Sequence, residues 1–309
     1  MKKIFSAALL LTLLTVLLCG CESGGQSASG YTFTDDLGRT VTVTSHDRTA
    51  ALLGSYADMW VLAGGSVCAS ADDAWEDFNL DMPSDAVNLG GTKSLSFEGL
   101  LSSKPDLVLA STNTPQHLEW QQNLENAGIT VAYFNVLGFA DYLRMFKICT
   151  DITGNHEAYD TYGTQLKTKI EEIIGRNADK PTQRVLVLRV SAGSIRAKNS
   201  EGTVLGEMLS DFGCENIADS DKSLLENLSV ESIALANPDR IFLVQVGDDI
   251  EGTQRNVENM FAENPLWGTL DAVKNNCVHY MEKRLYNLKP NAHWAEAYEK
   301  LEEILYAEQ

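Results

Sequence analysis

The segment LSFEGLLSSKPDLV (residues 95–108) recurs later in the chain as LSVESIALANPDRI (residues 228–241). Leu, Ser, Glu, Pro and Asp keep the same positions in both copies. This pattern predicts one local structure twice: the serine caps a short helix, the glutamate lies in its first turn, and Pro-Asp ends the helix before a buried strand. The chain is therefore expected to contain two copies of one supersecondary unit, one in each half.

The repeated glutamates, Glu98 and Glu231, allow two interpretations. Each carboxylate can simply offset the positive N-terminus of its helix, which is worth roughly 0.3–1 kcal/mol at an exposed position. Alternatively, the two carboxylates are matched docking charges, one per half, for a partner with two-fold symmetry. Their repetition at one helix position favours the docking interpretation.

Short apolar runs alternate with helical patterns on both sides of the repeat, after a hairpin pattern at residues 31–44. Such alternation predicts an α/β fold with two Rossmann-like lobes, each built on a central, mostly parallel sheet. A helical pattern from Asn155 to Gly175 predicts one long α-helix that joins the lobes. The expected boundaries are an N-terminal lobe at 31–154, the inter-lobe helix at 155–180 and a C-terminal lobe at 181–309. The expected strands lie at 49–53, 67–71, 107–110, 129–134, 185–190, 240–246 and 277–281, and the other expected helices at 57–63, 96–103, 115–126, 203–212, 229–236, 254–262 and 291–306.

The N-terminus has the features of an export signal. Two lysines precede a nearly unbroken apolar run that ends at Leu18, which is too short and wrongly flanked for a spanning helix. The sequence Leu-Cys-Gly-Cys at 18–21 resembles a bacterial lipobox, which implies removal of residues 1–20 and lipidation of Cys21. Residues 21–30 then form a flexible Gly/Ser-rich spacer. The protein is thus expected to be extracytoplasmic, and attached to the cell membrane by lipid alone.

Composition excludes several classes of protein. The formal charge of −19 argues against nucleic-acid binding, which needs a basic face. The sequence contains no Gly-x-Ser-x-Gly elbow, P-loop or Gly-x-Gly-x-x-Gly motif that would indicate an enzyme. The five histidines are scattered, so neither a bare metal site nor a catalytic site is expected. Cys149 is expected in the core, whereas Cys214 and Cys277 lie in the same half and could pair. The sequence leaves the redox state of these three cysteines and of Cys68 open.

Further motifs carry a family resemblance. They are Thr-Asp-Asp-Leu-Gly-Arg-Thr-Val at 34–41, both copies of the repeat, Asn-Pro-Leu-Trp at 264–267 with Ala-Val-Lys-Asn at 272–275, and Lys-Pro-Asn-Ala-His-Trp at 289–294. With them, the chain after the spacer resembles a cluster A, helical-backbone substrate-binding protein of an ABC importer for ferric siderophores, haem or cobalamin. The resemblance implies a ligand between two lobes, and pairing of Glu98 and Glu231 with arginines of the permease dimer. Little domain closure is expected as well, because a single helix between the lobes resists hinging better than loose strands.

Ligand residues are sought beyond the carboxyl ends of the parallel strands, where open α/β sheets bind ligands. Aromatic residues there can stack on a flat ligand, or can serve lobe packing instead. Basic side chains there can bind the carboxylates of a ferric chelate or of haem propionates. They can also be ordinary solvated charges, and we interpret Lys198 in this way. The candidate ligand-binding residues are Tyr56, Trp75, Thr112, Asn113, Arg196, Lys283 and Arg284.

The sequence thus predicts a monomeric, non-enzymatic lipoprotein that captures an iron chelate, with a ferric siderophore as first choice. Haem and cobalamin are alternatives within the same fold. A single His or Tyr that ligates haem cannot be recognised in the sequence, because one axial ligand has no characteristic spacing. A secreted α/β enzyme and a lipid-tethered adhesin are alternatives of other classes. The expected partners are a small-molecule metal chelate and an ABC permease dimer with its ATPase subunits. No cofactor of the protein's own is expected.

Overall fold

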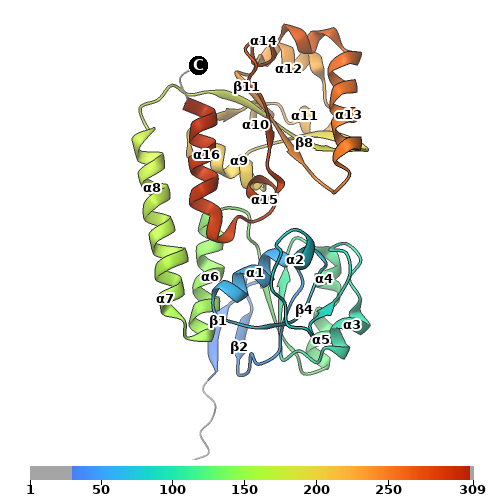
Figure 1. Cartoon of the computed structure of the whole chain (residues 1–309), viewed down its shortest axis with the longest axis vertical. Coiled ribbons are helices and arrows are strands. Elements are labelled where there is room, and N and C mark those ends of the chain that lie inside the picture. The colour runs from blue at the N-terminus through green and yellow to red at the C-terminus, as the bar shows by residue number, and fades with distance from the viewer. Residues whose placement is uncertain (1–29, 307–309) are drawn as a thin grey trace, which may run out of the picture. The chain divides into compact units, whose positions relative to one another are not determined.

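A computed structural model describes residues 30–306 (Figure 1). The predicted signal peptide, the predicted lipidation site Cys21 and nearly all of the predicted spacer lie outside the described residues. Within the described part of the chain, every helix is too short or too polar to cross a membrane.

The first lobe is built on a parallel sheet with strand order β5-β4-β3-β6-β7. The antiparallel hairpin of β1 and β2 precedes it, and its turn uses Gly38 with φ +76°, a conformation that favours glycine. The strands are β1 (Tyr31–Thr34), β2 (Thr40–Val43), β3 (Thr49–Ala51), β4 (Val67–Ser70), β5 (Val87–Asn88), β6 (Leu107–Ser111) and β7 (Thr130–Phe134). The helices are α1 (Gly54–Leu62), α2 (Asp73–Glu76), α3 (Phe97–Ser102), α4 (Pro115–Glu119), α5 (Gln121–Asn126) and α6 (Phe139–Thr153).

The second lobe has a mostly parallel sheet with strand order β10-β8-β11-β12, and β9 adds to β8 in antiparallel orientation. Its strands are β8 (Arg184–Ser191), β9 (Ser194–Lys198), β10 (Glu215–Asn216), β11 (Arg240–Gln245) and β12 (Val278–Met281). Its α-helices are α9 (Val204–Asp211), α10 (Ile217–Ser220), α11 (Ser223–Glu226), α12 (Val230–Ala236), α13 (Ile250–Glu263), α14 (Asp271–Lys274), α15 (Lys283–Tyr286) and α16 (Trp294–Tyr306), and its 3-10 helices are η2 (Pro265–Thr269) and η3 (Asn291–His293). The predicted α/β fold with two parallel-sheet lobes is confirmed.

The duplicated segment forms the same structure in both lobes. Ser96 caps α3 by accepting a hydrogen bond from the Gly99 amide at 3.0 Å, and Ser229 caps α12 through the Ser232 amide at 3.1 Å. The residue before each proline, Lys104 or Asn237, has a positive φ. Each helix then leads into an inner strand of its sheet, β6 or β11.

The aspartates of the repeat fasten these strands to their neighbours. The Asp106 amide donates to the Arg48 carbonyl at 2.9 Å, and the Asp239 amide donates to the Arg184 carbonyl at 2.7 Å. Their carboxylates accept hydrogen bonds from the amides of the same two arginines, at 3.2 and 2.7 Å. The expectation of one supersecondary unit in two copies is therefore confirmed down to the hydrogen-bond pattern.

Three consecutive helical segments join the lobes: α7 (His156–Tyr159), the π-helical segment η1 (Asp160–Gln165) and α8 (Leu166–Arg176). Asn155 caps the first segment as predicted, through a 3.2 Å bond from the Ala158 amide. The helix does not end at Gly175, since it continues to Arg176 and is capped by Asn177. The sequence pattern did not reveal the π-helical segment.

One hydrophobic core runs through both lobes and the joining helix. It includes Phe146 of the first lobe, Ile170 of α8, and Phe242 and Trp294 of the second lobe. The terminal helix α16 packs alongside α8, as Figure 1 shows. Smaller cores cover the other face of each sheet. Burial of this continuous apolar surface supplies the main force that holds the two lobes together.

The predicted elements are largely present, with a few differences. The helix expected at 115–126 is divided at Trp120 into α4 and α5, and the terminal helix begins with the 3-10 turn η3. Strands β5, β9 and β10 were not predicted. Cys149 is buried as expected, and the Cys214 thiol is free, so Cys214 and Cys277 do not pair.

Candidate functional site: a cationic cleft between the lobes

A cavity of about 440 Å³ lies where residues from the two lobes meet, and its size is typical of small-molecule sites. The first lobe contributes the residues that directly follow β6 and β7, beyond the carboxyl ends of two neighbouring parallel strands. The second lobe contributes β8, β9, β11, the start of α9 and the segment around α15. The lining residues are Asn113, Val136, Leu137, Val187, Arg189, Lys198, Gly202, Thr203, Val204, Leu205, Val244, Tyr286, Asn287 and Lys289.

Strand β9 explains how two of the lining cations come together. It pairs with β8 so that Lys198 lies opposite Val187, and Arg196 lies opposite Arg189. Because alternate residues of a strand share one face, Arg189, Arg196 and Lys198 project from the same side of the sheet. Of these, Arg189 and Lys198 line the cavity, whereas Arg196 is exposed farther along β9.

Three cations line the cavity without a carboxylate among its walls: Arg189, Lys198 and Lys289. Arg189 donates to the Asn287 side chain at 3.1 Å, and within residues 30–306 none of the three forms an ion pair. Burial lowers the pKa of all three side chains. Arg189 further lowers the pKa of both lysines, and Arg196 that of Lys198, because like charges disfavour the protonated form. The cleft is thus lined by three basic side chains without an ion pair, and the Asp73 carboxylate acts on one of them, since it raises the pKa of Lys289.

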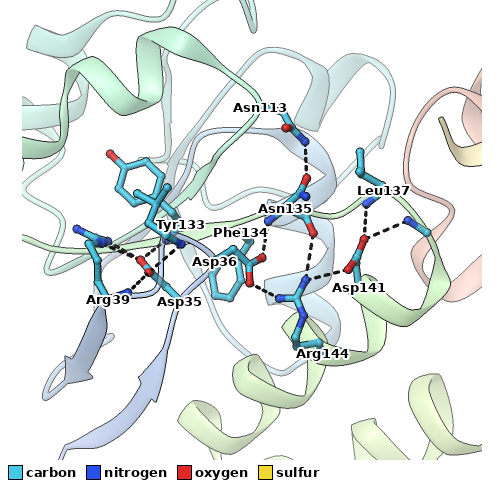
Figure 2. Close-up of polar contacts among 12 residues, drawn as sticks. Asp35, Asp36, Arg39, Asn113, Tyr133, Phe134, Asn135, Leu137, Asp141 and Arg144 are labelled. Carbon is cyan, nitrogen blue, oxygen red and sulfur yellow. Dashed lines mark hydrogen bonds and ion pairs between the residues drawn. The ribbon is translucent and has the colours of Figure 1, made fainter. Parts of the chain in front are cut away.

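The turn between β1 and β2 supports the cavity wall through a chain of polar contacts (Figure 2). The Asp36 carboxylate accepts a 2.6 Å bond from the Asn135 amide and pairs with Arg144 at 2.5 Å. Arg144 also donates to the Asn135 carbonyl at 3.2 Å. The Asn135 side chain in turn accepts a 2.6 Å bond from Asn113, which lines the cavity. Figure 2 shows this path from Asp36 to Asn113.

The same turn is anchored by a second aspartate. Asp35 accepts bonds from the Arg39 guanidinium and from the Tyr133 amide at 3.2 Å. Arg39 reaches on to the Val131 carbonyl at 2.9 Å. The Thr-Asp-Asp-Leu-Gly-Arg motif therefore fixes the turn to β7, whose end forms one wall of the cavity.

A buried histidine fixes the other loop of this wall. His117 is fully buried, and its Nδ1 accepts a 3.0 Å bond from the Ser111 amide at the end of β6. Its carbonyl accepts a 2.6 Å bond from the Tyr133 hydroxyl. Burial lowers the pKa of His117 to about 4, so the imidazole is neutral at pH 7. His117 thereby holds the loop that carries Asn113.

With this geometry known, comparison with other proteins identifies the family. Residues 50–285 match the periplasmic binding protein family. The chain belongs to that family. It is 26% identical over 294 residues to the iron-uptake system-binding protein of Bacillus subtilis, covering 90% of both chains. It is 26% identical over 317 residues to the putative ABC transporter substrate-binding lipoprotein YhfQ of the same organism, covering 96% of both.

A solved structure agrees on the fold of this periplasmic binding protein. Staphylococcus aureus SirA complexed with staphyloferrin B superposes with a TM-score of 0.67, at 20% identity, covering 89% of this chain and 97% of SirA. This likeness concerns the fold alone. Members of the periplasmic binding protein family bind solutes and are not enzymes, which confirms the non-enzymatic prediction.

The structure corrects the prediction for Tyr56. Its ring is fully buried in the core, and its hydroxyl donates to the Phe134 carbonyl at 2.9 Å. It cannot stack on a ligand from this position. Trp75 in α2 packs partly buried against the core and does not line the cavity. For both residues the structure shows the packing role that the sequence also allowed.

Two predicted cations hold the lobes together and do not line the cavity. Lys283 lies 2.7 Å from Asp77 of the first lobe and 2.8 Å from Asp248 of the second. Arg284 pairs with Asp58 of the first lobe at 3.1 Å, and its guanidinium lies 4.2 Å from the centre of the Phe78 ring. We therefore assign both cations to inter-lobe contacts.

The remaining predicted ligand residues lie near the cleft to different degrees. Asn113 lines the cavity, and the half-buried Thr112 is its neighbour in the chain without lining it. Arg196 is on the cationic face but outside the cavity.

Sequence reasoning missed the three cations of the cleft. Arg189 carried a signal, because it interrupts the otherwise apolar run of β8. Lys198 was interpreted as a solvated charge because β9 was not predicted. Lys289 stood only within a family motif.

The two repeated glutamates are exposed. Glu98 lies in the first turn of α3 and Glu231 in the first turn of α12, and neither forms an ion pair within the described residues. Among residues 30–306 the two carboxylates form a single hydrogen bond, which the Ser229 hydroxyl donates to Glu231 at 3.3 Å. Both carboxylates are thus available to an external cation.

Proposed function

We propose that this chain is the extracytoplasmic binding lipoprotein of an ABC importer, and that it carries a ferric siderophore in the cleft between its lobes. Two relatives of matching length support this role, since one is an iron-uptake system-binding protein and the other a putative ABC transporter substrate-binding lipoprotein. In this proposal the iron chelate is cargo, and the protein needs no cofactor of its own.

The observation that carries the ligand assignment is the positive cleft on an acidic protein. Arg189, Lys198 and Lys289 surround the cavity, although the whole chain has a formal charge of −19. A hydrogen bond to a charged partner is worth about 1.5–3 kcal/mol, which corresponds to roughly 10- to 150-fold in affinity per cation. The ligand is therefore an anionic chelate, such as a carboxylate siderophore that supplies the iron ligands itself.

Delivery requires a second set of contacts. Glu98 and Glu231, exposed on equivalent helices of the two lobes, dock onto cations of a permease dimer whose ATPase subunits drive uptake. Lipid on Cys21 holds the monomeric protein at the membrane surface, within reach of the permease.

The test begins with protein purified from its own host and a visible absorption spectrum. A broad charge-transfer band from a ferric chelate is expected, whereas a Soret band would identify haem and a corrin spectrum cobalamin. The stripped protein is then heated with ferric citrate, ferrioxamine B, haem or cobalamin. Ferric citrate is expected to raise the melting temperature most, because a ligand that binds only the native state stabilises it. No stabilisation by any chelate would refute the proposed function.

Lipid attachment is tested separately. Cys21→Ala should release the full chain from the membrane fraction without changing the affinity of the purified protein for ferric citrate. If the variant stayed in the membrane fraction, another anchor would have to be sought.

A further inference from the structure

A leucine on α12 is exposed to an unusual degree. Leu235 leaves 89% of its surface open to solvent, the largest exposed fraction of any large apolar side chain in the described part of the chain. Isolated exposed leucines are common on protein surfaces and need no functional explanation by themselves. The position of Leu235, and not its exposure alone, therefore has to decide whether it has a role.

Leu235 follows Glu231 by four residues on the same short helix. Residues four apart lie on one face of a helix, so the apolar side chain and the unpaired carboxylate form a single surface feature. The Ser229 cap and the buried Ile233 fix the orientation of this helix against its sheet. The feature is consequently presented on a rigid support.

The equivalent helix of the first lobe has the same combination. On α3, Leu101 follows Glu98 by three residues and keeps 39% of its surface exposed. Positions three apart also share a helix face. Although the leucine is shifted by one position between the copies, each lobe thus places an exposed leucine within one turn of an exposed, unpaired glutamate.

We propose that Leu101 and Leu235 are apolar contacts of the docking surface for the permease dimer, each inserting beside the ion pair of its neighbouring glutamate. This inference rests on the proposed function and adds to it the chemistry of the partner. The permease surface has, on each subunit, a small apolar depression flanked by a cation. The equivalent helices of the two lobes match the two subunits of the dimer, and the unpaired carboxylates supply charge complementarity.

Burial of an apolar side chain at an interface contributes affinity roughly in proportion to the apolar surface that it removes from water. Leu235, being the more exposed of the two leucines, has the more surface to bury. Replacing Leu235 is therefore expected to weaken docking more than replacing Leu101.

Photo-crosslinking in cells of the source organism tests this docking surface with the full-length protein. A photo-reactive amino acid replaces Leu235, Leu101, or one of two exposed apolar controls, Ile250 and Val61, which are 56% and 42% exposed on other helices. Mass spectrometry of the adducts is expected to identify an integral membrane permease subunit at positions 235 and 101 but not at the controls. Capture of a second copy of this chain, or equal capture at the controls, would overturn the inference.

A second measurement separates this inference from the proposed function. With the photo-reactive group at Ser232, beside Glu231, Leu235→Ser should reduce permease capture at least tenfold, and Leu101→Ser several-fold, whereas Ile250→Ser and Val61→Ser leave it unchanged. The affinity of purified L235S for ferric citrate should equal that of the wild type, which also confirms that the variant is folded. Undiminished capture with L235S would refute the leucine contacts alone. Absence of permease at every position would refute delivery to a permease, and the leucine contacts with it.

Discussion

Acidification should loosen the cleft through His117. The imidazole is neutral and fully buried at pH 7. Its Nδ1 accepts a hydrogen bond from the Ser111 amide, and Nε2 has no hydrogen-bond partner in the described part of the chain. A buried histidine whose pKa falls to about 4 resists protonation, so in the window between pH 6.5 and 4 the unfolded chain binds more protons than the folded chain. The free energy of unfolding therefore decreases as the pH falls through this window. Integration to pH 4.5 gives a loss of about 2–3 kcal/mol from this one residue.

The assay is urea unfolding of the wild type and of His117→Asn at pH 7 and pH 4.5. The Asn side chain can still accept from the Ser111 amide but does not titrate. At pH 7 the variant should be less stable by about 1–3 kcal/mol, because a buried ring is replaced by a smaller group. At pH 4.5 that difference should shrink by about 2–3 kcal/mol or reverse.

A buried carboxyl has the opposite effect on the wild type, which is why the comparison of variants is needed. Burial raises the pKa of Asp73 to about 6, so its contribution to stability increases as the pH falls. Because Asp73 is present in both proteins, its contribution cancels in the difference. An equal pH dependence of wild type and His117→Asn would refute the role assigned to His117, as would an NMR titration of this histidine near pH 6.5.

Four further substitutions test the support of the site and the caps of the repeated helices. Asp36→Ala removes the bonds to the Asn135 amide and Arg144, and should cost about 2 kcal/mol of stability. Calorimetry should also show several-fold weaker binding of ferric citrate. Unchanged affinity would show that the path to Asn113 is irrelevant to the ligand. Tyr56→Phe should cost about 1 kcal/mol in thermal unfolding and leave affinity intact, whereas a large affinity loss would restore Tyr56 as a ligand residue. Ser96→Ala and Ser229→Ala should each cost about 1 kcal/mol, and a strong inequality between them would argue against equivalent capping in the two lobes.

The fold could be predicted because its strongest signals are local. The cap, acid and Pro-Asp of the repeat specify a helix end and the start of a strand within a dozen residues, and the structure contains both copies with matching hydrogen bonds. The alternation of apolar runs likewise predicted both sheets. The π-helical segment of the joining helix was missed because its side-chain pattern hardly differs from that of an α-helix.

The candidate site was predicted less well because it depends on pairing between distant segments. Strand β9 turns Ser194–Lys198 into a partner of β8, and only this pairing brings Lys198 beside Arg189. Conversely, Lys283 and Arg284 look available in the sequence, but the packing of α15 against the first lobe gives them the partners Asp77 and Asp58. Charge and loop position identified the right residue types, while the choice among them required the tertiary structure.

The central claim is that Arg189, Lys198 and Lys289, the cations that line the cleft without an ion pair, bind an anionic iron chelate. Isothermal titration of ferric citrate into the wild type and into the variant Arg189→Gln, Lys198→Gln, Lys289→Gln tests it most directly. The wild type should bind with an affinity that falls as salt rises, and the variant should bind at least roughly 100-fold more weakly, with little dependence on salt. Equal affinities at low salt, with the variant still folded, would contradict the claim.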